Sequence, residues 1–175
     1  YSNCFTLYII AAFLGWPFFD AAEGIFFTAE GTLDEAKTFT TLGEKLKEFD
    51  RAVVPGFYGS LPDGSIKTFS RGGSDVTGSI VARAVNADLY ENWTDVSGML
   101  SADPRVVKNP KVIEHITYTE LRELSYMGAS VLHEDAVFPV RKAGIPINIL
   151  NTNQPDSKGT MIVPELPERS SSPSN

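Results

Sequence analysis

One short segment of this chain, Arg-Gly-Gly-Ser-Asp, combines the groups that bind a phosphate or another small anion. Arg71, Ser74 and Asp75 supply a cation, a hydroxyl and a carboxylate around two adjacent glycines, Gly72 and Gly73. Glycine lets the backbone turn tightly and approach a ligand closely. The helix expected to follow would direct its first N–H groups, which lack intrahelical acceptors, at that ligand. The segment therefore suits a phosphate group that is being transferred. An ordinary tight turn followed by a helix N-cap would have the same sequence pattern.

A second polar cluster follows the next expected strand, which ends at Trp93. Thr94 and Asp95 offer a hydroxyl and a carboxylate for contacts with a ribose or a base, and Asp-Pro-Arg at 103–105 holds Arg105 after a rigid turn. In a purely structural alternative, the carboxylates cap turns and Arg105 pairs with one of them. Taken alone, this cluster leaves both interpretations open.

The elements expected to position these clusters alternate between helices and strands. Apolar spacing and turn residues predict helices over 2–14, 32–49, 76–86, 117–127 and 133–143, and strands over 16–20, 25–28, 52–54, 65–69, 88–93, 146–151 and 160–163. Such alternation indicates an α/β fold with a mainly parallel sheet. Ligands bind outside the carboxyl ends of strands in these sheets, so we expect both clusters to lie on one edge and share a cleft.

Local patterns add detail to three of these helices. The helix at 2–14 is apolar on most sides, so we expect it to be mostly buried, with Cys4 as an inert buried thiol. Residues 32–35 and 117–120 each read Thr-x-x-Glu, the capping box that begins a helix.

Composition limits the class of protein. The chain has 175 residues with a net charge of −7, which argues against nucleic acid or an anionic membrane as the main partner. The apolar run at 5–19 is too short to span a bilayer, and a single cysteine fits a reducing, cytoplasmic compartment. His115 and His133 have no metal-ligand spacing around them, so no metal site is expected.

Five motifs in a fixed order resemble the aspartate kinases of the amino-acid-kinase family. They are Phe-x-Arg-Gly-Gly-Ser-Asp at 69–75, Trp-Thr-Asp-Val-x-Gly at 93–98, Asp-Pro-Arg-Val-Val at 103–107, Met-Gly-Ala-Ser-Val-Leu-His at 127–133, and Ile-Pro-Ile at 145–147 followed by Gly-Thr at 159–160. The resemblance covers residues 14–163. Each motif alone is common, but the combination is specific.

The resemblance implies a fold and an activity. The fold would be a three-layer α/β/α sandwich with a mainly parallel sheet, here incomplete. Residues 1–163 would form the nucleotide-binding half and part of the aspartate site, and the Pro- and Ser-rich residues 164–175 a linker or tail. We expect the chain to be a piece of a longer parent protein. That protein would use ATP with Mg²⁺ to convert L-aspartate to 4-phospho-L-aspartate, the entry step to lysine, threonine and methionine. Family members commonly form homo-oligomers.

The resemblance also implies roles for individual residues. On the acceptor side, Arg71 would bind a substrate carboxylate and Asp75 would organise the catalytic site. The remaining acceptor-side residues would be Phe57, Gly72, Gly73 and Ser74. The nucleotide side would consist of Thr94, Asp95, Leu100, Arg105, Ser130 and Val131.

The chain departs from the family at several positions. A Lys-Phe-Gly-Gly motif and a Gly-Glu motif would lie before Tyr1, so we expect this piece to have little or no kinase activity alone. Many relatives carry lysine where this chain has Ser130, and some carry an aromatic residue where it has Leu100. Two alternatives stay open: a kinase of the same fold for glutamate, acetylglutamate, carbamate or a nucleoside monophosphate, and a nucleotide-binding module without catalysis.

Overall fold

In the computed structural model, the chain divides into two units, one formed by residues 1–90 and 132–145 and the other by residues 91–131 and 146–175. The structure describes residues 2–102, 106–126, 132 and 134–165. The helices and strands alternate along the chain, and the prediction of an α/β fold is confirmed.

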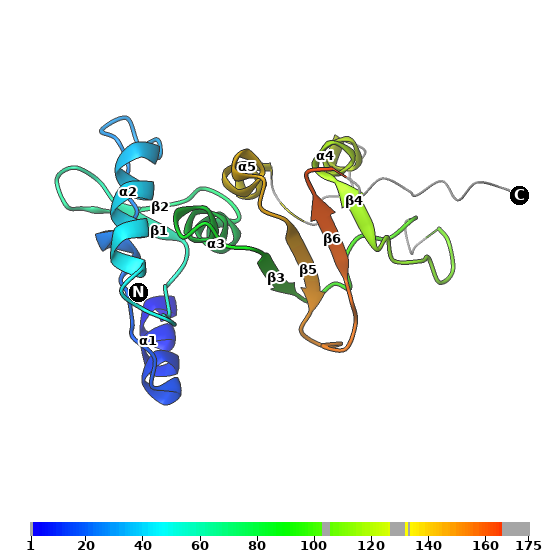
Figure 1. Cartoon of the computed structure of the whole chain (residues 1–175), viewed down its shortest axis with the longest axis horizontal. Helices are drawn as coiled ribbons and strands as arrows, with labels where there is room; N and C mark the ends of the chain where they lie inside the picture. Colours follow the sequence, from blue (N-terminus) through cyan, green and yellow to red (C-terminus); the bar gives the residue numbers. More distant parts are fainter. Residues whose placement is uncertain (1, 103–105, 127–131, 133, 166–175) are drawn as a thin grey trace, which may run out of the picture. The chain divides into compact units, whose positions relative to one another are not determined.

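The first unit is mainly helical (Figure 1). Its elements are α1 (Ser2–Leu14), η1 (Ala21–Glu23), α2 (Glu35–Leu46), β1 (Tyr58–Ser60), β2 (Ile66–Thr68), α3 (Gly73–Ala84) and α5 (Glu134–Ala143). Helices α2 and α5 pack against α3, and α3 and α5 lie side by side. Ile25, Leu42 and Ile80 are fully buried in the core between them. This packing fixes the position of α3, whose first turn carries the Arg-Gly-Gly-Ser-Asp segment.

Three strands expected in the first unit are reduced to isolated bridges. Phe18 pairs with Val53, Phe26 with Ser60, and both pairings are parallel. The expected strands at 16–20, 25–28 and 52–54 are therefore wrong in extent, although their apolar residues do pair. Each is followed within a few residues by a turn or a helix, which leaves no room for a longer ladder.

Helix α2 begins at Glu35, and the expected capping box at 32–35 is wrong. Asp34 is the N-cap, because its Oδ1 accepts a hydrogen bond of 3.1 Å from the backbone N–H of Lys37. The Thr32 hydroxyl is instead 2.9 Å from the hydroxyl of Thr28, within the preceding turn. The aspartate two residues after this threonine takes the capping position, and aspartate is among the best N-cap residues.

Helix α1 is mostly exposed, which contradicts the expectation that it is buried. Phe5, Tyr8 and Phe13 are 67%, 58% and 88% exposed, and Ala11 is the buried apolar residue on this helix. The described chain covers one side of α1, through contacts such as the edge-to-face pair of Tyr8 and Phe18. A helix that is apolar all round needs neighbours on every side to be buried.

Cys4, at the start of α1, is half-buried rather than buried. Its Sγ lies 3.4 Å from the hydroxyl of Tyr58, which in turn donates a 2.8 Å hydrogen bond to Asp20. The thiol is therefore part of a small polar contact between α1 and β1, because β1 brings a tyrosine hydroxyl to a position that an apolar neighbour was expected to occupy.

The second unit contains a four-stranded sheet in the order β3-β5-β6-β4. Its elements are β3 (Tyr90–Thr94), which starts at the last residue of the first unit, β4 (His115–Thr117), α4 (Tyr118–Tyr126), β5 (Ile147–Asn151) and β6 (Thr160–Val163). Strands β4 and β6 are parallel, whereas β5 and β6 are antiparallel. The short connection at 152–159 accounts for the antiparallel pair, because a parallel pair requires a longer crossover.

The predicted capping box at 117–120 is confirmed. Glu120 Oε2 accepts a 2.7 Å hydrogen bond from the N–H of Thr117, and Thr117 Oγ1 accepts one of 3.2 Å from the N–H of Glu120.

Among the described residues, no helix is both long and apolar enough to cross a bilayer.

Candidate functional site

The glycine pair forms the start of α3. Gly72 is the N-cap residue with φ 54° and ψ 30°, in the left-handed region, and it has no side-chain cap. The helix begins at Gly73 rather than at Val76 as predicted, and the N–H of Val76 donates to the Gly72 carbonyl at 2.9 Å. The N–H groups of the first turn thus belong to the Arg-Gly-Gly-Ser-Asp segment itself, as an anion site at a helix start requires.

Phe57 lies directly against this first turn. Its N–H donates to Thr77 Oγ1 at 3.0 Å and to the Gly73 carbonyl at 3.3 Å, and its carbonyl accepts from the N–H of Phe69 at 3.0 Å. These bonds hold Phe57 at φ 88°, which is a strained value for a bulky residue. Its side chain is 43% exposed. The structure therefore brings the predicted substrate-binding Phe57 to the predicted anion-binding turn.

Close packing explains why position 73 is occupied by glycine. A Cβ at Gly73 would overlap the ring of Phe57 and lie 3.1 Å from its Cα. Likewise, a Cβ at Gly56 would lie 3.0 Å from the Cα of Ser74. The sequence predicts that Gly73 allows a ligand to approach the backbone, whereas in the structure Gly73 allows the 56–57 segment to do so. Gly72 is needed for its left-handed backbone instead.

The three polar side chains of the segment differ in exposure. Arg71 and Ser74 are exposed and Asp75 is half-buried. The Asp75 carbonyl accepts a 3.2 Å hydrogen bond from the hydroxyl of Tyr90. Arg71 forms no ion pair with any residue that the structure describes. Its guanidinium is therefore not neutralised from within this part of the chain and is suited to an anionic ligand.

Arg71 also lines a cavity of about 460 Å³, which we call the Lys67 cavity. The loop before α2, the end of β2, the first half of α3 and the middle of α5 form its walls. Its charged lining residues are Lys67, Arg71 and Glu35, and its aromatic ones are Phe27, Phe69 and Phe138.

Glu35 is the acid of this cavity, and it is already paired. Its Oε2 lies 3.1 Å from Arg83 Nη1 and 3.2 Å from Lys142 Nζ. Partial burial raises the pKa of the Glu35 carboxyl, but the hydrogen bonds and charges of Lys142 and Arg83 outweigh it. The pKa therefore lies below the usual value of 4.5. Glu35 joins α2 to α3 and α5 through these pairs.

We expect this ion-pair cluster to make a small, pH-dependent contribution to stability. Since the folded-state pKa of Glu35 is lowered, the contribution is present above the unfolded-state pKa and is lost as the pH falls through the folded-state pKa. The Glu35 side chain is 38% exposed, so solvent screening limits the contribution to about 1 kcal/mol or less.

Urea unfolding of the Glu35→Gln variant tests this expectation. Its deficit in unfolding free energy relative to the unaltered chain should shrink between about pH 6 and about pH 3. Glu44→Gln, at an exposed position of the same helix without an ion pair to a described residue, is the matched control. A deficit that is constant across this pH range would contradict the assignment.

The second predicted cluster lies at the carboxyl end of β3, as expected. The Thr94 carbonyl accepts hydrogen bonds from the N–H and the hydroxyl of Thr152 at 2.8 and 3.0 Å, and the Thr94 hydroxyl lies 3.3 Å from Asp95 Oδ1. Asp95 is exposed, and Leu100, which is 36% exposed, bridges to Val112. Thr94 and Asp95 thus lie together beside the end of β5.

Polar residues at and just after the end of β5, on the same edge of this sheet, were not predicted from the sequence. Asn151 Nδ2 donates a 2.7 Å hydrogen bond to Ser97 Oγ, which is also 3.1 Å from Gln154 Oε1. The signal was available, because the polar run at 151–154 directly follows an apolar strand. Carboxyl ends of neighbouring strands are where such side chains gather.

The remaining nucleotide-side predictions, Arg105, Ser130 and Val131, lie outside the described residues.

The expectation that both clusters lie on one sheet edge is wrong. Arg71–Asp75 follows β2, which in the described part of the chain forms a two-stranded sheet with β1, whereas Thr94 ends a strand of the four-stranded sheet. The turn at 61–65 closes β1 and β2 into a separate two-stranded sheet. The two clusters belong to different units of the chain.

Within the described ranges, no group of three or more His, Cys, Asp or Glu side chains is arranged to hold a metal ion.

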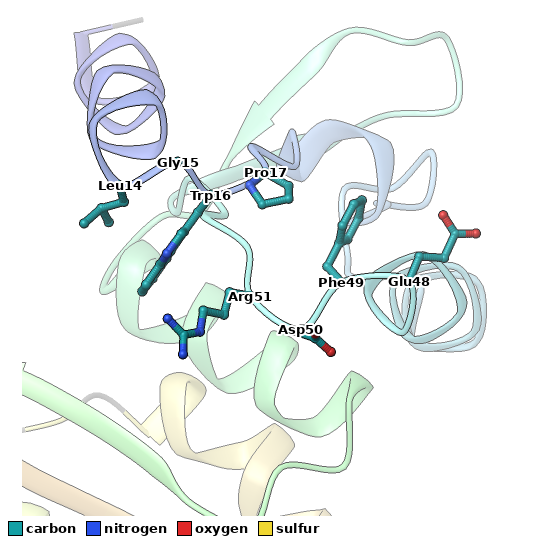
Figure 2. Close-up of a pocket in the computed structure, with 8 residues that line it drawn as sticks. All are labelled: Leu14, Gly15, Trp16, Pro17, Glu48, Phe49, Asp50 and Arg51. Atoms are coloured by element: carbon teal, nitrogen blue, oxygen red, sulfur yellow. The ribbon is translucent and has the colours of Figure 1, made fainter.

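A larger cavity of about 900 Å³ lies between the end of α1 and the segment after α2. Figure 2 shows the Trp16 ring beside Arg51, whose guanidinium lies 5.6 Å from the ring centroid. None of the predicted site residues that the structure describes lines that cavity.

Comparison with known proteins gives consistent matches. The sequence profile of the amino acid kinase family matches residues 17–151. Aspartokinase 3 of Bacillus subtilis is 52% identical over 120 residues, which cover 68% of this chain and 26% of that protein. The crystal structure of Clostridium acetobutylicum aspartate kinase has a TM-score of 0.89 and 60% identity, over 92% of this chain and 37% of that one.

A fourth match carries ligands. The structure of E. coli aspartokinase III in complex with aspartate and ADP has a TM-score of 0.84 and 27% identity, over 95% of this chain and 40% of that one. The chain therefore spans well under half the length of each of these relatives.

Proposed function

The chain belongs to the amino acid kinase family, and we propose that the longer protein to which it corresponds is an aspartate kinase. That protein would transfer the γ-phosphoryl group of ATP to the side-chain carboxylate of L-aspartate, giving 4-phospho-L-aspartate. The similarity to the aspartate kinase of C. acetobutylicum, over nearly the whole of this chain, is the observation that carries the proposal. Such an enzyme would serve amino-acid biosynthesis in the cytoplasm, as a homo-oligomer.

On the acceptor side, we assign recognition of aspartate to the turn before α3. Arg71 would bind one substrate carboxylate through its two-pronged guanidinium, and its lack of a described ion-pair partner supports this role. Ser74 is exposed beside it on the first turn of α3. Phe57 would cover the bound substrate, since its partly exposed side chain is held against the same turn.

The chemistry requires charge neutralisation more than proton transfer. The acceptor carboxylate is already a nucleophile, so no base has to deprotonate it. The difficulty is to bring two anions together, which positioned cations and N–H groups make possible. The N–H groups of Gly73 and Ser74 and the Arg71 guanidinium would supply such charge, and Asp75 would orient the groups around them.

On the nucleotide side, we assign contacts with ATP to the carboxyl edge of β3. Thr94 and Asp95 would contact the ribose or base, Leu100 would lie beside the base, and Arg105 would contact the phosphates. Ser130 and Val131 would complete this side. The E. coli relative binds ADP together with aspartate, which supports a nucleotide site in this family member.

Mg²⁺ would accompany the nucleotide. The described residues offer single carboxylates, such as Asp75, rather than a group of three ligands. This donor set fits a metal held mainly by phosphate oxygens and water, with one or two protein carboxylates. When bound, Mg²⁺ neutralises charge on the phosphates; the chain's own residues position the acceptor.

A coupled assay of ADP release by the full-length protein tests the proposed function. The acceptors would be L-aspartate, L-glutamate, N-acetyl-L-glutamate, carbamate and UMP, each with Mg-ATP. Of these acceptors, we expect only L-aspartate to be phosphorylated. Turnover with one of the other acceptors would replace the proposal with a different kinase of the same fold.

A second outcome would point to a different class of protein. If calorimetry detects binding of Mg-ATP but no acceptor is phosphorylated, the protein is a nucleotide-binding module without catalysis. The sequence of the parent protein before the first residue of this chain discriminates further, because a Lys-Phe-Gly-Gly motif there would support the enzyme.

A further inference from the structure

We propose that the Lys67 cavity binds a small carboxylate that carries an apolar group. The cavity lies wholly within the first unit of the chain. Arg71, which we assign to the acceptor carboxylate, also lines it. Ligand binding to the cavity can be measured without nucleotide or acceptor, so a failure of this proposal is distinguishable from a failure of the kinase assignment.

The charge of the cavity favours an anion. Lys67 and Arg71 line it, and neither forms an ion pair with a residue in the described ranges. Glu35, the acid in the lining, is within 3.2 Å of both Lys142 and Arg83. The lining therefore carries uncompensated positive charge, although the chain as a whole has a net charge of −7. A carboxylate would neutralise it through charge-assisted hydrogen bonds.

The walls favour an apolar group on that anion. The rings of Phe27 and Phe69 pack with their centroids 5.1 Å apart, and Phe138 of α5, which is 44% exposed, lies on another wall. Val76 and Leu33 add aliphatic surface. Ligand sites typically combine apolar walls with a few polar groups in cavities of about 300–1,000 Å³, and this cavity of about 460 Å³ falls in that range.

Lys67 is held in position rather than free at the surface. Its Nζ lies 5.7 Å from the centroid of the Phe27 ring. Its Cε and Nζ also pass so close to Gly31 that a Cβ there would be 3.0 Å from both. Gly31 has φ 82°, a left-handed value that glycine adopts without strain. The loop before α2 and the β2 strand thus place the ammonium group against the aromatic wall.

Calorimetric titration of the 175-residue chain tests the proposal with 3-phenylpropanoate as the probe. We expect 3-phenylpropanoate to bind at least about tenfold more tightly than its neutral analogue 3-phenylpropanamide, because Lys67 and Arg71 attract only the anion. Inorganic phosphate should bind more weakly than 3-phenylpropanoate, because it gains nothing from the aromatic walls. Equal affinities for the acid and the amide, or tighter binding of phosphate, would overturn the proposal.

Substitutions then locate the binding site. Lys67→Met keeps the length of the side chain but removes its charge, and it should weaken binding of 3-phenylpropanoate at least about fivefold, with Lys67→Arg restoring most of it. Phe138→Ala, at a partly exposed position, should weaken binding as well.

Lys37→Met is the matched control. Lys37 Nζ also lies over a phenylalanine ring, 4.0 Å from the centroid of Phe26, but Lys37 does not line the cavity. This variant should bind the probe as the unaltered chain does. The proposal is wrong if Lys67→Met and Phe138→Ala both bind normally, or if Lys37→Met weakens binding as much as Lys67→Met does.

Discussion

Replacing Arg71 with alanine in the full-length protein is expected to lower kcat/KM for L-aspartate by about 30- to 1,000-fold, which corresponds to about 2–4 kcal/mol of lost transition-state stabilisation. Arg71 is exposed and forms no ion pair with a described residue, so removing it should disturb the acceptor and not the fold. The effect should fall mainly on KM for L-aspartate, with KM for ATP little changed, because the role assigned to Arg71 is to bind the acceptor carboxylate.

Two further variants sharpen this measurement. Arg71→Lys keeps the charge but loses the planar fork, so its kcat/KM should lie between those of the alanine variant and the unaltered enzyme. Arg51→Ala removes an arginine that lies near Trp16 in the cavity of Figure 2, and none of the described residues of the proposed site lines that cavity. It should leave the kinetics unchanged. An Arg71→Ala enzyme with normal KM for L-aspartate would refute the assigned role.

Replacing Gly73 with alanine is expected to destabilise the chain by about 1–3 kcal/mol, the range for an added methyl group in a packed site. The new Cβ would overlap the Phe57 ring and lie 3.1 Å from the Phe57 Cα. Urea unfolding of the chain measures the loss. Ser74→Ala, at the next and exposed position, should change stability far less. In the full-length enzyme, Gly73→Ala should also raise KM for L-aspartate, because Phe57 would be displaced.

A double-mutant cycle identifies the cause of that loss. Phe57→Gly removes the ring and supplies a residue that tolerates φ 88°. If the clash between these two positions causes the loss, Gly73→Ala should destabilise the Phe57→Gly background less than the unaltered chain. Equal destabilisation in both backgrounds would show that the contact with the Phe57 side chain is not responsible.

Local chemistry explains where the sequence predicted the fold well. The capping box at 117–120 forms as expected, because its donors and acceptors are only three residues apart. The strand predicted at 160–163 matches β6 residue for residue, since a glycine turn precedes this short apolar run. Helix α2 instead begins at Glu35 because Asp34 caps it, a competition between neighbours that a pattern of letters does not decide.

Tertiary packing explains where the sequence failed. The apolar sequence of α1 predicts that this helix is buried, but it does not indicate whether a neighbouring segment is present to cover it. The described chain covers one side of α1. The role of Gly73 was assigned to ligand access because the approach of Phe57 depends on a segment distant in sequence. Phenylalanine gives no signal of a left-handed backbone, so the strained conformation of Phe57 was not predictable either.

The N–H of Phe57 donates hydrogen bonds to Gly73 and Thr77. These bonds couple Phe57, which would cover the acceptor, to the start of α3, which would bind the acceptor's charge. A substitution that adds a side chain at position 73 needs a smaller residue at position 57, because the two compete for the same space. Laboratory evolution toward a new acceptor should therefore recover substitutions at position 73 only together with one at position 57.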